Sequence, residues 1–220
     1  MRMGRSGKLF LLSAWLLFSS FGSADGEEWE ASDYGWFIAG GLTGFVVHEG
    51  AHMLVAESFG LHPRVDTRSK PVPFIVIRYD LFKKNGSNTE YVDREGRPIS
   101  GGAQKRFAIA SAGINSQNIS SELILSFYPD LREERRPFLK GVLAFDIVTS
   151  IGYAVVGRLD PDGDLRGMSE SRGVNNLFIA ALVFTPAALD LYRYYNPESA
   201  WAPWVSRGTK AYLLGLSFRW

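Results

Sequence analysis

Two histidines in the sequence have a spacing that suits a shared metal ion. His48 and His52 belong to the run VVHEGAHM, which has the form His-Glu-x-x-His. On a helix, residues four apart share a face, so both imidazoles can bind one zinc ion. Glu49 then reaches the water on that zinc and can accept its proton. The alternative is a helix that carries two incidental histidines.

The residues before the motif continue the same helical face. Gly40, Gly44, His48 and His52 are spaced by four, and small residues at that spacing let another backbone approach closely. The face that carries the histidines is therefore expected to pack closely against a second helix or to admit a substrate.

The helix around the motif is expected to start near Ser32 or Asp33, both suitable N-cap residues. It should run to about Phe59, with Gly60 as its C-terminal stop. Its apolar part, residues 34–56, is long enough to span a bilayer. Ionisable groups inside such a segment are costly and usually functional.

Composition limits the function classes. The chain has 220 residues, a formal net charge of +1 and no cysteine. A charge this small gives no electrostatic case for binding nucleic acid. The lack of cysteine excludes thiolate zinc ligands, a catalytic cysteine and disulfides.

Residues 1–24 resemble a secretory signal peptide or an N-terminal anchor. A basic start is followed by an apolar stretch over residues 9–18 and by the small residues 22–24. Residues 25–220 are then expected to form a single metallopeptidase-like domain. The expected location is a membrane, of the bacterial inner-membrane or envelope type, reached through the N-terminal signal.

A β insertion is expected at about residues 61–100. Residues 72–79 are rich in strand-forming side chains, residues 84–88 are a turn signal, and residues 89–92 are the candidate return strand. His62 at the start of this region is interpreted as an exposed loop residue.

Three further apolar segments cover about residues 103–128, 138–156 and 174–195. With the motif helix they predict a mainly α fold, a bundle of about four apolar, membrane-embedded helices. Apolar residues alternate from Tyr212 to Trp220, which is the period of a strand. That pattern predicts a C-terminal edge strand.

A cluster of acids follows the third apolar segment, at Asp160, Asp162 and Asp164. Its glycine and its twelfth position do not fit an EF-hand loop. A third zinc ligand is the better hypothesis, and a solvated turn is the alternative. Asp146, inside the third apolar segment, is another candidate acid.

The order of these features resembles the site-2 protease family of membrane-embedded zinc metalloproteases. The resemblance rests on His-Glu-x-x-His in an apolar helix, an Ala-Gly-x-x-x-x-Asn-like segment at residues 112–118, and Asp-Gly at residues 162–163. The sequence departs from the family at Ile114, where the family usually has proline, and in the charged residues around Asp162. Soluble zincin patterns fit less well, because the positions that would carry their further ligands do not match.

The resemblance implies a site. His48, His52 and Asp162 would bind Zn²⁺, with Asp160, Asp164 and Asp146 as alternative third ligands. Glu49 would be the general base, and Asn118, or else Asn115, would match the family's active-site asparagine.

The expected function is a zinc-dependent endopeptidase of the site-2 protease type, which cleaves peptide bonds in or near a membrane. Its partners would be a peptide or membrane-protein substrate and the lipid bilayer. The extended substrate could pair with the edge of the β insertion. The rival interpretations are a non-catalytic membrane or envelope protein on a metalloprotease scaffold, and a zinc-storage or zinc-sensing site that would not need Glu49.

Overall fold

A computed structural model of the chain describes residues 21, 29–68, 74–84, 87, 90–160 and 163–218. The predicted signal or anchor over residues 1–24 lies outside these ranges except for Phe21.

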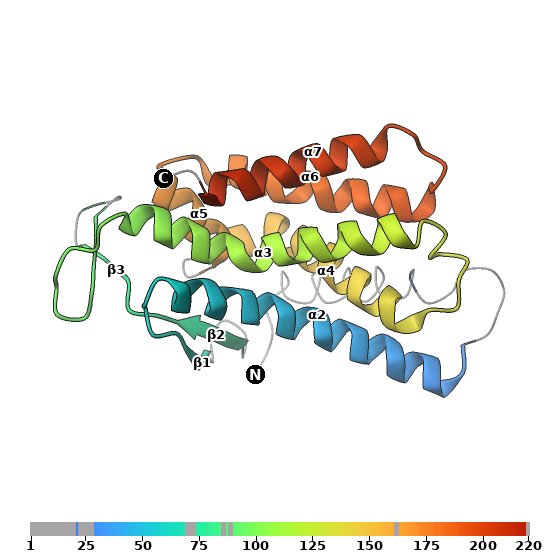
Figure 1. The fold of residues 1–220 in the computed structure, drawn as a ribbon, viewed down its shortest axis with the longest axis horizontal. Coiled ribbons are helices and arrows are strands. Elements are labelled where there is room, and N and C mark those ends of the chain that lie inside the picture. Colours follow the sequence, from blue (N-terminus) through green and yellow to red (C-terminus); the bar gives the residue numbers. More distant parts are fainter. Residues whose placement is uncertain are drawn as a thin grey trace.

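The described residues are mainly helical, as the sequence predicts, and the helices lie roughly along one axis (Figure 1). The helices are α2 (Ala31–Ser58), α3 (Gly102–Phe127), α4 (Pro137–Val155), α5 (Asp164–Arg172), α6 (Asn176–Tyr195) and α7 (Ala202–Phe218), with a 3₁₀ turn at Gly157–Leu159. The strands are β1 (Arg64–Arg68), β2 (Phe74–Arg78), β3 (Phe82–Lys83) and β4 (Tyr91–Val92).

The prediction of about four apolar, membrane-embedded helices is confirmed in part. Among the described residues, only α4 and α6 are both long and apolar enough to cross a bilayer. Helices α2 and α3 are long enough to cross a bilayer, but the glycine and polar residues on their packing faces lower their mean hydropathy. Length and composition alone are weak evidence for spanning, since core helices of soluble proteins share them.

Helix α2 has the predicted extent, with a different N-cap. Glu30 is the cap residue, its side chain accepts from the backbone of Asp33, and Asp33 accepts from the backbone of Glu30 in return. This reciprocal pair is a capping box with an acid in place of serine or threonine. At the other end, Gly60 has φ +67°, the left-handed conformation that glycine takes at helix stops.

The small residues of α2 bring it against α4, as the spacing of four predicts. Gly40, Gly44, His48, His52 and Ala56 are all buried on one face. A β-carbon added at Gly40 would lie 2.1 Å from the carbonyl oxygen of Phe138 in α4. A β-carbon added at Gly141 would lie 2.0 Å from the carbonyl oxygen of Phe37. The two helices therefore touch backbone to backbone.

Gly141→Ala is expected to separate α2 from α4. The obstructing atom is a backbone oxygen, so no side-chain rotation relieves the overlap, and overpacking of this kind costs about 1–3 kcal/mol or more. The measurement is the unfolding midpoint followed by circular dichroism. The control is Gly35→Ala, in α2, where an added β-carbon has no neighbour within 4 Å. A midpoint for Gly141→Ala equal to that of the control would refute the close contact.

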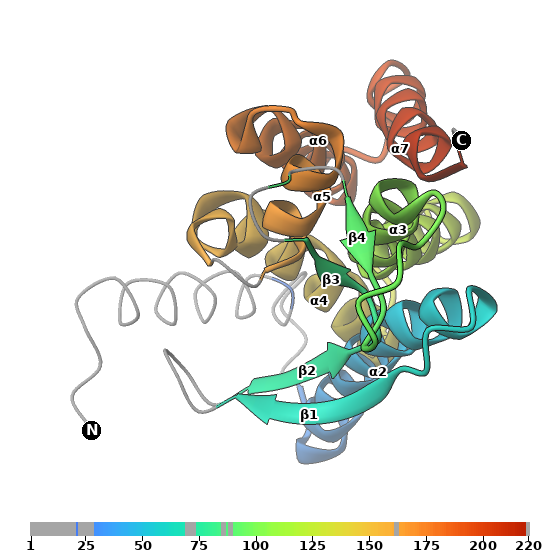
Figure 2. The same cartoon turned by 90° about the vertical axis from the view of Figure 1, so that its left-hand side faces the viewer.

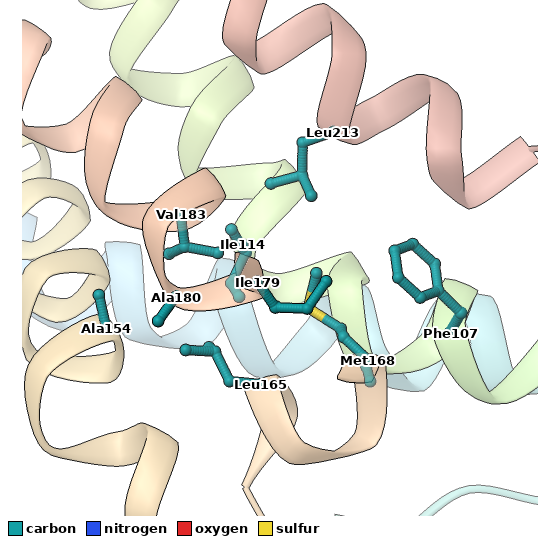
Figure 3. Close-up of a cluster of buried hydrophobic side chains, with 10 residues drawn as sticks. Phe107, Ile114, Ala154, Leu165, Met168, Ile179, Ala180, Val183 and Leu213 are labelled. Carbon is teal, nitrogen blue, oxygen red and sulfur yellow. The ribbon is translucent and has the colours of Figure 1, made fainter. Parts of the chain in front are cut away.

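The main hydrophobic cluster joins α3 to the second half of the chain (Figure 3). Helix α5, which the sequence patterns did not predict, inserts Leu165 and Met168 into it beside Phe107 and Ile114 of α3. All four side chains are fully buried. This contact fixes the position of α5, whose first residue is Asp164.

The β insertion is confirmed, with a different strand pairing. Strand β2 pairs antiparallel with β1, whereas β3 pairs antiparallel with β4. The sequence patterns missed β1, a short strand of alternating charged and uncharged residues. Both hairpins lie at one end of the bundle, where α2 ends and α3 and α5 begin (Figure 2).

The predicted C-terminal edge strand is wrong, because residues 202–218 form helix α7. The buried positions Ala202, Ser206, Lys210, Leu213 and Ser217 follow a helical period. Most of them are small or polar, so a pattern of apolar residues cannot reveal the buried face.

Polar contacts hold α7 in place. The ammonium of Lys210 lies 2.6 Å from Asp190 of α6 and 3.0 Å from Glu122 of α3. Ser206 donates to Asp190, and Ser217 accepts from Asn115. Buried charges require such partners, so these pairs set the register of α7 on α3 and α6.

Candidate metal centre

Three side chains converge between α2 and the start of α5. The Nε2 atoms of His48 and His52 are 3.2 Å apart. A carboxylate oxygen of Asp164 lies 3.6 Å from Nε2 of His48 and 3.4 Å from Nε2 of His52. Both histidines are buried, whereas the Asp164 side chain is 23% exposed.

The spacing of these atoms fits a tetrahedral metal site. Zinc bonds of about 2.0–2.2 Å at tetrahedral angles separate neighbouring ligand atoms by about 3.3–3.5 Å. The three observed separations fall around that range. Two imidazoles and one carboxylate with a fourth position open form a ligand set typical of catalytic zinc. The residues present therefore fit the implied ion.

A backbone contact from α3 orients His52. The Nδ1 atom of His52 lies 2.6 Å from the carbonyl oxygen of Ile109. With the proton on Nδ1, the Nε2 lone pair faces His48 and Asp164. A backbone carbonyl on the second imidazole nitrogen is a common way to fix a ligand histidine.

Gly113 lets α3 approach the histidines closely enough for this contact. A β-carbon added at Gly113 would lie 2.5 Å from Nε2 of His48 and 2.6 Å from Nε2 of His52. The space beside both ligand atoms therefore depends on the missing side chain.

Asp164 reaches the site because α5 packs closely on α3. A β-carbon at Gly167, one turn into α5, would lie 3.0 Å from Cβ of Ala110. Together with the buried Leu165 and Met168, this contact sets the depth of α5. Asp164, in its first turn, then faces the two imidazoles.

A cavity of about 100 Å³ opens beside the three groups. Glu49 and His52 of α2, Tyr153 of α4, and Gly163 and Asp164 line one part of it. Ile75, Val76 and Ile77 of β2 line another part. Glu49 is thus in the same cavity as the ligand atoms, as a base that serves an attacking water must be.

The two imidazoles stabilise the negative charge of Asp164. Burial by itself would raise the pKa of Asp164, but the adjacent His52 and His48 outweigh burial and hold that pKa well below its ordinary value.

The other predicted site residues lie apart from the ligand atoms or outside the described residues. Asp162 is outside the described residues, so its role as a ligand stays a prediction. Asp160 lines the cavity, but the metal-binding group among the described residues consists of His48, His52 and Asp164. Asp146 is buried and forms a hydrogen bond with Ser120.

Within the described part of the chain, no hydrogen bond links the metal centre to either predicted asparagine, Asn115 or Asn118. Asn115 donates to Ser217 of α7 and helps to hold that helix. Asn118 is buried, and its amide nitrogen has no partner within the described part of the chain. A catalytic role for Asn118 stays a prediction.

Two residues of the site escaped the sequence analysis. Tyr153 stacks on His48, with ring centroids 5.6 Å apart, and Gly113 packs against both imidazoles. The signal for Gly113 was present, because it is the second residue of the segment that resembles the protease family. Nothing in the apolar run around Tyr153 marks it.

No family model, curated protein or solved structure matches the chain.

Proposed function

We propose that the protein is a zinc-dependent endopeptidase that acts in or near a membrane, of the site-2 protease type that its motifs resemble. The observation that carries the proposal is the triangle of His48, His52 and Asp164, with ligand atoms 3.2–3.6 Å apart. The presence of Glu49 in the adjoining cavity adds to it. A storage site would need the triangle alone.

Each residue has a distinct task in this proposal. His48, His52 and Asp164 would hold the ion. Zinc, when bound, would polarise the scissile carbonyl and activate a water molecule. Glu49 accepts the proton of the attacking water and delivers it to the leaving amine.

The outward face of α2 supports contact with lipid. Tyr34, Ile38, Leu42 and Val46 are spaced by four and are 56–65% exposed, and Leu54 is 74% exposed. They lie opposite the glycine and histidine face. An outward face of large apolar side chains suits contact with lipid rather than with water.

Aromatic residues support a membrane boundary at the end of the bundle opposite the hairpins. There α2, α4 and α7 begin and α6 ends (Figure 1). The exposed aromatic residues there are Trp36 of α2, Tyr192 of α6, Trp204 of α7 and Trp201, which immediately precedes α7. Such residues favour the headgroup region. His48 follows Trp36 by twelve residues, or about 18 Å of helix. With α2 embedded in a core about 30 Å thick, the proposed centre would lie nearer the boundary on the side of the hairpins.

Strand β2 offers a way to hold a substrate. Among the described residues it pairs with β1 along one edge only, and three of its residues line the cavity. An extended peptide added to the other edge would gain backbone hydrogen bonds and pass the metal centre. The substrate class is therefore a locally unwound segment of a membrane protein or an extended peptide.

Elemental analysis of the purified protein tests the proposal. We expect close to one zinc per chain in the wild type and its loss in His48→Ala and in Asp164→Ala. Asp160→Ala is the matched control, since its carboxylate lines the cavity outside the triangle, and it should keep zinc. Asp162→Ala, beside them, tests the ligand that the resemblance favours.

Two outcomes would count against the assignment. Zinc retained in Asp164→Ala but lost in Asp162→Ala would move the third ligand to Asp162. A wild-type protein that stays free of zinc after reconstitution would refute the enzyme and leave the non-catalytic membrane protein.

A further inference from the structure

Packing holds Tyr153 beside the metal centre. Its ring stacks on the His48 imidazole at an interplanar angle of 21°. A β-carbon added at Gly157 would lie 2.7 Å from Cδ1 of Tyr153, so the glycine leaves room for the ring. Helix α4, which carries Tyr153, is fixed on α2 by the backbone contacts at Gly40 and Gly141. The hydroxyl position is thus set by packing.

The hydroxyl of Tyr153 lies next to the ligand atoms. Its oxygen is 3.4 Å from Nε2 of His48, which is about the distance that separates the ligand atoms from one another. Tyr153 also lines the cavity that contains Glu49. The hydroxyl therefore borders the space where a carbonyl group held by the centre would sit.

A bound ion changes the hydrogen bonding of this hydroxyl. The Nε2 lone pair of His48 cannot bind an ion and accept from Tyr153 at the same time. The hydroxyl, which is partly buried and lines the cavity, is then available to donate to another acceptor. A substrate oxygen beside the ion is such an acceptor.

We infer that Tyr153 donates a hydrogen bond to the oxygen of the scissile carbonyl as negative charge develops on it. This inference rests on the proposed function and adds a catalytic residue that the sequence motifs do not contain. A fixed donor aimed at developing charge in a dry site is an efficient form of catalysis.

The step balances without a further reactant. The water oxygen bonds to the carbonyl carbon, its proton passes to Glu49, and the carbonyl π pair moves onto the carbonyl oxygen. Tyr153 keeps its proton and donates a hydrogen bond to that oxygen. The carbonyl re-forms as the C–N bond breaks, and Glu49 gives its proton to the amine.

The test is Tyr153→Phe, which keeps the ring stacked on His48 and removes only the hydroxyl. The probe is acetohydroxamic acid, a small zinc-binding oxygen ligand that requires no knowledge of the natural substrate. Its affinity is measured by calorimetry on the zinc-loaded protein, beside zinc content. The control is Tyr91→Phe, the same change at a buried tyrosine of β4, in the hydrophobic cluster that also contains Ala56 of α2 and Ile109 of α3.

We expect Tyr153→Phe to keep its zinc and to bind the hydroxamate about 10- to 100-fold more weakly, as loss of a hydrogen bond to a charged oxygen implies. Tyr91→Phe should bind like the wild type. Equal affinity in Tyr153→Phe would overturn the inference and leave the proposed function standing. Tighter binding would overturn it by making Tyr153 a ligand that the hydroxamate displaces. Loss of zinc in Tyr153→Phe would overturn it in favour of a metal-holding role, and absence of zinc in the wild type would overturn both proposals.

Discussion

Glu49→Gln is expected to keep zinc and to lose nearly all peptidase activity. Glutamine has the shape of glutamate but cannot accept the proton of the attacking water. Loss of a general base typically lowers a rate by about 10²- to 10⁴-fold. Glu49 is next to His48 in sequence yet outside the ligand triangle, so the change should leave the zinc content near one per chain.

The measurement compares new peptide termini, identified by mass spectrometry, after wild-type and Glu49→Gln proteins are incubated in vesicles with model transmembrane peptides. Elemental analysis of the same preparations shows whether zinc is retained. The control is Glu57→Gln on the same helix, an exposed glutamate near its end, which should cleave like the wild type. A Glu49→Gln protein that holds zinc and cleaves at the wild-type rate would remove Glu49 from the mechanism and favour a storage or sensing site.

The part of the site that lies on α2 could be predicted from the sequence because it is local. His48, Glu49 and His52 fall within five consecutive residues, and helical geometry alone puts the two histidines on one face. Their burial also follows in part from Gly40 and Gly44, because these glycines let α4 approach the same face of α2.

The third position could not be predicted in the same way, because it depends on how α5 packs. Asp160, Asp162 and Asp164 are equivalent by composition. Only the buried Leu165 and Met168 turn Asp164 toward the histidines. A helix of nine residues with charged positions on its outer side gives a weak sequence signal.

The error at the C-terminus has a related cause. Alternating apolar residues predicted a strand, yet the buried face of α7 includes Ser206, Lys210 and Ser217. These side chains are buried because Asp190 and Asn115 lie opposite them. A pattern built on hydrophobicity cannot detect a helix whose inner face is held by ion pairs and hydroxyl groups.

Gly113→Ala is expected to abolish tight zinc binding without touching any ligand. The added β-carbon would lie 2.5 Å from two ring atoms of His48 and 2.6 Å from Nε2 of His52. Both imidazoles would have to rotate, or α3 would have to move away and release the Ile109 carbonyl from His52. Loss of outer-shell support alone costs about 10- to 100-fold in metal affinity. Displacement of two ligand atoms should exceed that.

Zinc affinity, measured by competition with a chelator, is the quantity to compare, together with the unfolding midpoint of the zinc-free protein. The matched control is Gly50→Ala, which adds a methyl group between the two histidines of the motif, where no atom lies within 4 Å. Gly50→Ala should keep wild-type affinity, because alanine suits a helix better than glycine does. If Gly113→Ala bound zinc as tightly as Gly50→Ala does, α3 could not lie against the imidazoles at the observed distance. The metal centre would then be assembled by α2 and α5 alone, and the Ile109 carbonyl would not orient His52.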